Sequence, residues 1–147
     1  MGKTTHRMAA GLGMLVLAAL LVTGCASSKE PAFYQGDAPP QLEVERWGWR
    51  ASSNMFWVAE GVVKNLTDQP LEGVTAVCSF YDAGGTFRKS ESGRIEKVIP
   101  PGKSVQFRVC ATVDPGVALA RIDFTDFMGE YLPVKQEEPR LRAMRAD

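Results

Sequence analysis

Histidine is nearly absent from this chain of 147 residues, whose only imidazole is that of His6. The chain beyond residue 24 therefore has no histidine for a Ser–His or Cys–His catalytic pair or for a zinc site. An excess of basic charge is also absent, because 17 Lys and Arg residues face 17 Asp and Glu residues. A nucleic-acid-binding face needs such an excess. The composition thus removes the commonest routes to hydrolysis and argues against nucleic acid as a partner.

Long apolar runs are missing too. The run Met8–Val22 has 15 residues, whereas roughly 20 are needed to cross the hydrocarbon core of a bilayer. Basic residues precede this run and small residues follow it, which is the arrangement of an export signal. An uncleaved transmembrane anchor and a secretory signal cut at another position are the two alternatives.

The end of this run resembles a bacterial lipobox, in which an aliphatic residue and two small or modest ones precede a cysteine. The matching residues are Val22, Thr23, Gly24 and Cys25. The resemblance implies that residues 1–24 are a lipoprotein signal peptide and that Cys25 becomes an acylated N-terminus carrying fatty acids such as palmitate. Two or more acyl chains anchor a protein stably. Because Ala26 follows the cysteine, we expect a lipid anchor in the cell envelope, at the outer membrane and facing the periplasm.

The 123 residues that remain, 25–147, are enough for one domain. Residues 25–41 are polar and rich in proline, so they predict a flexible linker that spans on the order of 20 Å. Phe33 and Tyr34 within it either cover an apolar patch of the domain or are mobile. Residues 135–147 form a charged C-terminal tail, for which we expect fraying. Its basic residues could touch anionic lipid or cell-wall polymer, although a solvated terminus is favoured: Arg140, Arg142 and Arg145.

Between residues 42 and 134, apolar runs alternate with turn residues at the short, regular spacing of a β-sandwich or barrel. Leu42–Glu45 alternates cleanly, and Trp47 and Trp49 then take the opposite parity. A β-bulge near Arg46 would return both tryptophans to the core face; otherwise the strand shows an aromatic face outward. The charged stretch 86–99 predicts an exposed pair of edge strands.

Several residues of this region resemble an FxLYD domain, a small immunoglobulin-like β-sandwich found in exported bacterial and archaeal proteins. They are Gly61, Val63, Asn65, Phe80, Tyr81, Asp82 and Gly85, followed by Ile99-Pro100-Pro101-Gly102. A second resemblance is to the YcfL-like group of small outer-membrane lipoproteins. Both imply an all-β fold, an immunoglobulin-like antiparallel β-sandwich of about seven strands, here preceded by a signal helix and the linker. Neither brings a catalytic residue with it.

The motif also has a direct physical interpretation. Phe80 is expected to fill the core at the end of a central strand. Tyr81 should cover the rim with its hydroxyl group in water, and Asp82 should cap the following turn. Asp123 and Asp126 complete a set of acidic residues that lacks the spacing of a calcium loop, so turn caps and solvated strand residues are the better account. We predict no metal and no cofactor.

Two further features are open to more than one interpretation. Cys78 and Cys110 could form a disulfide in an oxidising compartment, or they could be separate thiols with one of them buried. Trp47 and Trp49, near Trp57, could form an exposed platform for a glycan such as peptidoglycan, or they could belong to the core.

The sequence therefore predicts a lipid-anchored, non-catalytic binding or assembly module of the cell envelope. Its expected partners are the membrane, through the anchor, and another envelope protein or a cell-wall component. One mode of binding would be strand addition at an exposed edge in 86–99. The alternative function is a glycan-binding lipoprotein that uses Trp47 and Trp49. The weakest alternative is an envelope enzyme that depends on carboxylates.

Overall fold

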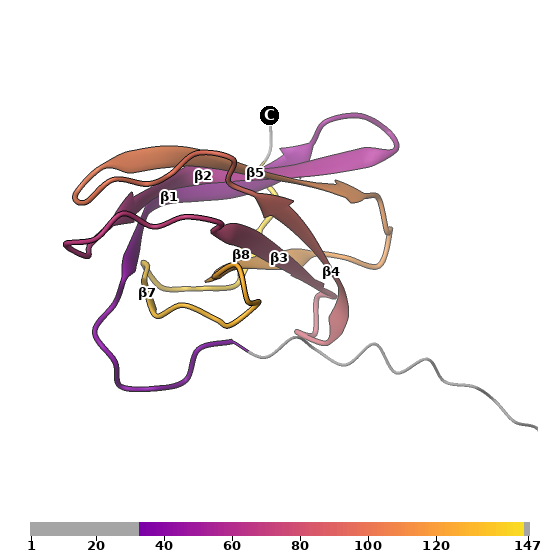
Figure 1. The fold of residues 1–147 in the computed structure, drawn as a ribbon. Coiled ribbons are helices and arrows are strands. Elements are labelled where there is room, and N and C mark those ends of the chain that lie inside the picture. The colour runs from indigo at the N-terminus through magenta and orange to yellow at the C-terminus, as the bar shows by residue number, and fades with distance from the viewer. Residues whose placement is uncertain (1–32, 146–147) are drawn as a thin grey trace, which may run out of the picture.

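A computed structural model describes residues 33–145, in which eight strands form two four-stranded sheets packed face to face (Figure 1). The first sheet has the strand order β5–β2–β1–β7 and the second β4–β3–β6–β8. The strands are β1 (Leu42–Ala51), β2 (Phe56–Asn65), β3 (Thr75–Tyr81), β4 (Phe87–Arg94), β5 (Ser104–Thr112), β6 (Leu119–Thr125), β7 (Val134–Lys135) and β8 (Arg142–Ala143). The predicted all-β sandwich is confirmed. The expected signal peptide and Cys25 lie outside the described residues.

Strand pairing is antiparallel throughout these two sheets, except for the short parallel pair of β1 and β7. Across residues 33–145 no helix could span a membrane.

A β-bulge in β1 decides which side chains form the core. The register of β1 against β2 shifts between Val44 and Arg46, so Glu45 is an extra residue. Leu42 and Val44 face the core before the bulge, and Trp47 and Trp49 face it afterwards; all four are buried. The bulge predicted near Arg46 is confirmed, and an outward aromatic face of β1 is thereby ruled out.

Aromatic rings fill the space between the two sheets. Trp49 makes edge-to-face contacts with Trp57 and Phe80, at centroid distances of 5.3 and 5.7 Å. Phe107 and Phe124 form a second such pair at 5.2 Å. Offset and edge-to-face aromatic pairs stabilise a core by about 0.5–1.5 kcal/mol beyond the burial of their area. These rings come from both sheets, so they hold the two layers together.

Gly61 of β2 makes room for this packing beside the bulge. A Cβ atom at this position would lie 2.6 Å from Cβ of Trp47 and 2.7 Å from Cζ of Phe107. The nearest atom of all would be the backbone carbonyl oxygen of Arg46. Real Cβ atoms do not approach other atoms so closely, so a larger residue would force the backbone of β1 to shift. Val63, two residues later, is fully buried on the same face.

Asn65 ends β2 and pins the loops at that end of the sandwich. Its side chain is completely buried, and its amide nitrogen donates to the carbonyl oxygens of Gln69 (2.7 Å) and Ile99 (2.9 Å). Its Oδ1 accepts from the backbone N–H and the hydroxyl group of Thr67, both at 2.8 Å. A buried amide with all these bonds made stabilises the turn, whereas an unpaired one would be costly. The motif asparagine is therefore structural.

The Phe80-Tyr81-Asp82 run also builds the fold. Phe80 is fully buried, and Asp82 Oδ1 accepts from the backbone N–H groups of Gly84 and Thr86, both at 2.9 Å. Gly85 has a φ of 81°, which favours glycine in this turn. These roles are as predicted. The prediction that Tyr81 covers the rim with its hydroxyl group in water is wrong, because the residue is only 2% exposed and packs edge-on against Phe87.

The stretch 86–99 forms one strand, β4, and not the predicted pair of exposed edge strands. β4 does lie at the edge of the second sheet, but β5 of the first sheet runs beside it. The Lys89 ammonium group donates to the carbonyl oxygen of Thr112, and Arg88 pairs with Asp114 at 3.5 Å. Gly93 packs directly against the Arg108 carbonyl group. The edge of β4 is therefore occupied.

The C-terminal tail is part of the sandwich and not frayed. β7 pairs with the start of β1, and β8 pairs with the start of β6. The Trp49 indole N–H donates to the carbonyl oxygen of Arg142 (2.9 Å), and the Arg142 guanidinium donates to the carbonyl oxygen of Trp47 (3.1 Å). The backbone N–H of Arg145 donates to the carbonyl oxygen of Trp49 at 2.9 Å. These contacts correct the expectation of a solvated terminus, and the domain continues beyond residue 134.

The close approach of β4 to β5 gives a testable prediction. In Gly93→Ala, the new Cβ atom would overlap the carbonyl oxygen of Arg108, which is backbone and cannot rotate away. We expect a loss of about 1–3 kcal/mol in the free energy of unfolding, as for overpacked sites. Urea denaturation followed by tryptophan fluorescence measures it. Ser92→Ala, at an exposed neighbour, is the control. Equal stability of the two variants would show that the strands are not in contact.

Candidate functional site

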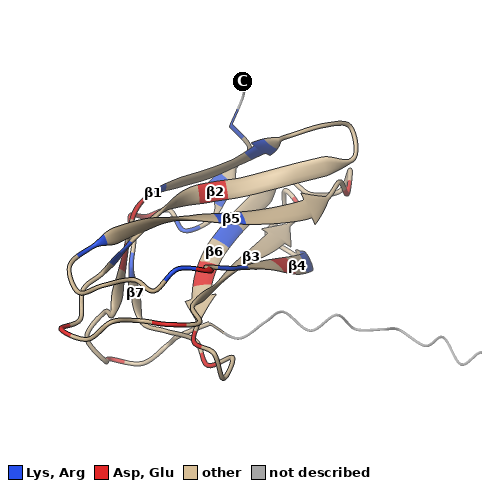
Figure 2. Ribbon diagram, turned by 45° about the horizontal axis from the view of Figure 1, so that its top comes forward, with Lys and Arg blue, Asp and Glu red and all other residues tan. Residues whose placement is uncertain are grey.

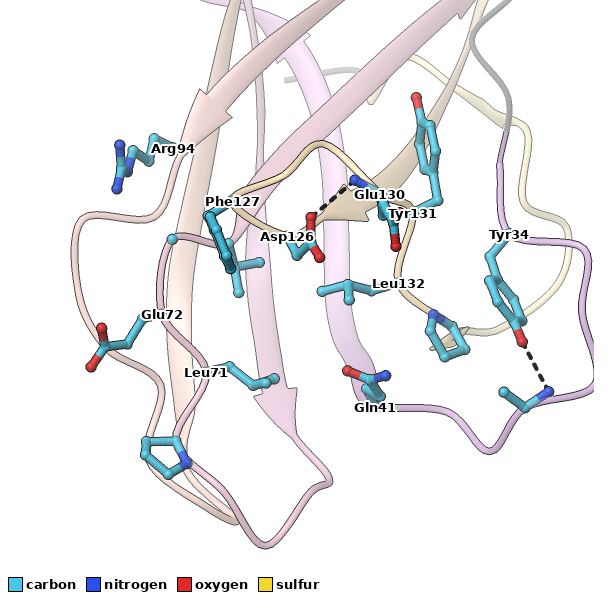
Figure 3. A pocket seen from close by; sticks show the side chains of 15 residues that line it. Tyr34, Gln41, Leu71, Glu72, Arg94, Asp126, Phe127, Glu130, Tyr131 and Leu132 are labelled. Carbon is cyan, nitrogen blue, oxygen red and sulfur yellow. Dashed lines mark hydrogen bonds between the residues drawn. The ribbon is translucent and has the colours of Figure 1, made fainter.

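The main candidate site is a groove of about 930 Å³ at one end of the sandwich (Figure 3). Three segments that are far apart in the sequence form it: the chain before β1, the 70–74 loop and the 126–133 loop. Figure 3 shows Arg94 and Glu72 at one side of the groove and Tyr34 at the other. We call it the tether-side groove, because the segment that leads back towards Cys25 forms one of its walls.

A tight turn exposes two apolar side chains, of which that of Phe127 lines this groove. Asp126 Oδ1 accepts from the backbone N–H groups of Met128 (2.8 Å) and Glu130 (2.9 Å), and Gly129 has a φ of 85°. The turn is therefore fixed by its own hydrogen bonds. It holds Phe127 77% exposed and Met128 72% exposed. A fixed turn that exposes two large apolar side chains is a feature of interaction surfaces.

The 70–74 loop supports this turn from below. Gly73 has a φ of 67°, and a Cβ atom at this position would lie only 2.8 Å from Cβ of Phe127. Leu71 is held by two backbone hydrogen bonds to Ile99, of 3.0 and 2.8 Å. Glycine at position 73 thus lets the loop and the turn approach each other, and Phe127 is positioned by this contact.

The segment before β1 forms the opposite wall. The Tyr34 hydroxyl group accepts from the backbone N–H of Ala38 at 3.0 Å, and Gln41 N–H donates to the carbonyl oxygen of Pro133 at 2.8 Å. Phe33 lies over the guanidinium group of Arg121, 4.3 Å from the ring centroid. The chain from residue 33 onwards is therefore docked on the domain, but Phe33 covers the guanidinium group of Arg121 and not the apolar patch that we considered.

Beneath Phe33 lies a buried ion pair on the outer face of β6. Arg121 Nε and Asp123 Oδ2 are 2.7 Å apart, and less than a tenth of either side chain is exposed. In Figure 2 a blue and a red segment lie close together on β6. Asp123 is thus not the solvated strand residue that we predicted. Burial and the carboxylate of Asp123 raise the pKa of the Tyr131 phenol, and Arg121 opposes this shift.

The electrostatic character of the tether-side groove is acidic. Its lining includes three carboxylates, those of Glu72, Asp126 and Glu130, against one guanidinium group, that of Arg94. Aromatic and aliphatic side chains separate these charges. A ligand with apolar groups and positive charge would be complementary to such a surface.

Of the two interpretations of Trp47 and Trp49, the structure supports the core position and not the exposed platform. Trp49 is fully buried and Trp47 is 5% exposed, so neither ring can stack on a glycan. Both rings lie beneath the C-terminal segment: the Arg142 guanidinium group is 5.2 Å from the ring centroid of Trp47. The bulge in β1 and the docked tail together turn these residues into core.

The two cysteines do not form the disulfide that the sequence allowed. Both are free, with Cys78 in the core and Cys110 exposed on the outer face of β5. Their strands belong to different sheets, and Cys110 alternates with Val109 and Ala111, which face inward. Burial, together with the carboxylate of Asp123, raises the pKa of the Cys78 thiol. The interpretation as separate thiols, one of them buried, is the one that the structure supports.

No group of metal-binding side chains occurs in the part of the chain that the structure describes. Asp82 and Asp126 serve as turn caps, as predicted.

The sequence reasoning missed the tether-side groove. The sequence Asp126-Phe127-Met128-Gly129 could have predicted the turn that exposes Phe127, because aspartate followed by glycine three residues later is typical of a turn. The other walls could not be found this way, because tertiary contacts alone bring Tyr34 and Gly73 beside this turn.

Thiol accessibility tests the placement of the two cysteines. In the Cys25→Ser protein, we expect a maleimide reagent to modify Cys110 rapidly and Cys78 only after unfolding, because Cys78 is buried and its thiolate is disfavoured. Mass spectrometry of the labelled peptides measures both rates. Cys110→Ser provides the matched control and should give no label in the native state. A native protein in which neither thiol reacts until a reductant is added would demonstrate the bridge.

Comparisons with known proteins show the fold alone. No family model and no curated protein matches this chain. Among solved structures, the chain is similar to the C-terminal domain of Wzt, with a TM-score of 0.52 and 10% identity over 74% of this chain and 76% of that one. It is also similar to part of Bacteroides uniformis β-glucuronidase 2, with a TM-score of 0.52 and 15% identity over 73% of this chain but only 15% of the enzyme. Similar sandwiches thus occur in proteins of quite different sequence.

Proposed function

We propose that this protein is a lipid-anchored binding module of the cell envelope. It would be tethered through Cys25 at the outer membrane, with an FxLYD-like sandwich as its scaffold and no catalytic role. The tether-side groove would bind a segment of another envelope protein. The observation that carries the proposal is the fixed turn that exposes Phe127 and Met128 beside the groove.

The chemistry of the groove indicates what the bound segment would contain. Phe127 and Leu132 would contact an apolar side chain, and the carboxylates of Glu72 and Glu130 would attract a Lys or Arg residue beside it. Aromatic residues at the centre of a binding surface contribute most of its affinity, so Phe127 is the residue whose loss should matter most.

Side-chain binding in this groove is better supported than strand addition. The edge of β4, where the sequence suggested pairing with a partner, is covered by β5. The edges of β1 and β6 are partly occupied by β7, β8 and the backbone of Arg145. A partner strand would have to displace these contacts before it could form its own hydrogen bonds.

Lipid attachment is tested directly in cells. We expect the wild-type protein to incorporate labelled palmitate and to fractionate with outer membranes, whereas Cys25→Ser should do neither, because the thiol is the acceptor of the lipid. Cys110→Ser is the matched control and should behave as wild type. A soluble, unlabelled wild-type protein would disprove the anchor.

Site-specific crosslinking tests the groove independently of the anchor. A photoreactive phenylalanine in place of Phe127 should give a discrete crosslinked protein in intact cells, because this residue is expected to contact the partner. The control position is Met55, which is 66% exposed in the hairpin after β1, at the far end of that strand from the groove. Equal products from both positions, or none from position 127 in a membrane-bound protein, would contradict a binding site at the groove.

A further inference from the structure

A second groove, of about 890 Å³, crosses β1, β2 and β5 and continues along the 94–97 segment. Five cationic side chains line it, against two carboxylates. The cations are Arg46, Arg94, Lys97, Arg108 and Arg145, and the carboxylates are Glu60 and Glu96. We call it the basic groove. Its charge is opposite to that of the tether-side groove, and Arg94 lies between the two.

The positive charge of this groove is not neutralised by the protein itself. All five cations are exposed, and no ion pair between residues 33 and 145 includes any of them. Of the two carboxylates, Glu60 is already paired with Arg50, at 3.5 Å. A cluster of unpaired charges of one sign attracts a ligand of the other sign.

One of these cations is held in place by the fold. The backbone N–H of Arg145 donates to the carbonyl oxygen of Trp49, which fixes the last described residue against β1. Its side chain lies over Gly48, where a Cβ atom would overlap the guanidinium group. Glycine at this position therefore provides the space that Arg145 occupies, and the tail adds a charge to the groove.

The lining between the cations is partly apolar. Arg46 lies opposite Val62, which in turn lies opposite Gln106, and the next row has Glu60 opposite Arg108. Val62 is half-buried in the groove lining, whereas Val105 alternates with Gln106 and packs against the core. A ligand that fits has to offer negative groups for the cations and an apolar group for Val62.

The basic groove faces away from the point where the described chain begins. Phe33 packs on Arg121 of the second sheet, whereas β1, β2 and β5 belong to the first. In Figure 1 the segment before β1 runs below the second sheet, on the side away from the first. With the lipid anchor that we propose for Cys25, the membrane would be approached from the side of the second sheet.

From these observations, we infer that the basic groove binds an acidic segment of a partner protein, in which acidic and apolar side chains share the face turned towards the groove. A lipid headgroup layer is less compatible, because the groove is turned away from the tether. An anionic polysaccharide has no apolar side chain to cover Val62. In an extended segment, every second side chain points the same way, about 7 Å apart, so acidic and apolar residues at those positions can meet the cations and Val62 together.

Fluorescence anisotropy with the full-length protein in detergent micelles tests this inference. The probe is a fluorescein-labelled peptide that repeats Glu-Ala-Leu-Ala, so that glutamate and leucine lie on the same face of the extended chain. We expect binding that weakens as salt is added and that falls about fivefold or more in Arg46→Gln/Arg108→Gln, because two exposed charge pairs are lost. The control is Lys103→Gln, which removes an exposed cation outside the groove and should leave the affinity unchanged. Near-ultraviolet circular dichroism verifies that both variants are folded.

Three outcomes would overturn the inference: equal affinity for a peptide with lysine in place of glutamate, unchanged affinity in the double variant, or tighter binding to phosphatidylglycerol vesicles or hyaluronate than to the acidic peptide. Phe127→Ala should bind the acidic peptide as wild type does. A failure here would therefore leave the tether-side groove untouched, and a failure of crosslinking at position 127 would leave the basic groove untouched.

Discussion

Most of this structure depends on the contacts that buried Trp49 makes. Its ring meets Trp57 of its own sheet and Phe80 of the other, and its indole N–H and carbonyl group both bond to the C-terminal segment. Without the bulge at Glu45, this side chain would lie on the outer face of β1. One extra residue in a strand therefore closes the core, docks the tail and removes the aromatic surface that would otherwise have been the obvious ligand site.

Coverage of the sheet edges explains why binding is better assigned to grooves. Beside β4, the backbone of Gly93 meets the Arg108 carbonyl group, and the short strands β7 and β8 pair with β1 and β6. Unpaired strand edges promote aggregation, and proteins avoid them by such covering. What remains available is the surface made by side chains and loops. On this surface, the fold does not require the exposure of Phe127 or of the unpaired cations in the basic groove.

The two grooves place surfaces of opposite charge on different parts of the domain. Near the segment before β1, the surface combines exposed apolar residues with carboxylates. On the first sheet, it combines Val62 with arginines. The chain is neutral overall, with 17 basic and 17 acidic residues, so this separation of charge is invisible in the composition. With the anchor that we propose at Cys25, two surfaces of opposite charge would suit the domain to holding two different segments near the membrane, as an assembly module does.

The sequence by itself determined the sandwich, the bulge near Arg46 and the capping role of Asp82, because alternation and turn chemistry are local properties of neighbouring residues. It also contains residues that resemble a lipobox ending at Cys25, which lies outside the described residues. Only the tertiary structure decided that Cys78 and Cys110 stay apart, that Trp47 is covered by the tail, and that Tyr34 stands across a groove from Arg94. These outcomes depend on contacts between segments that are far apart in the sequence. Local patterns of neighbouring residues do not specify such contacts.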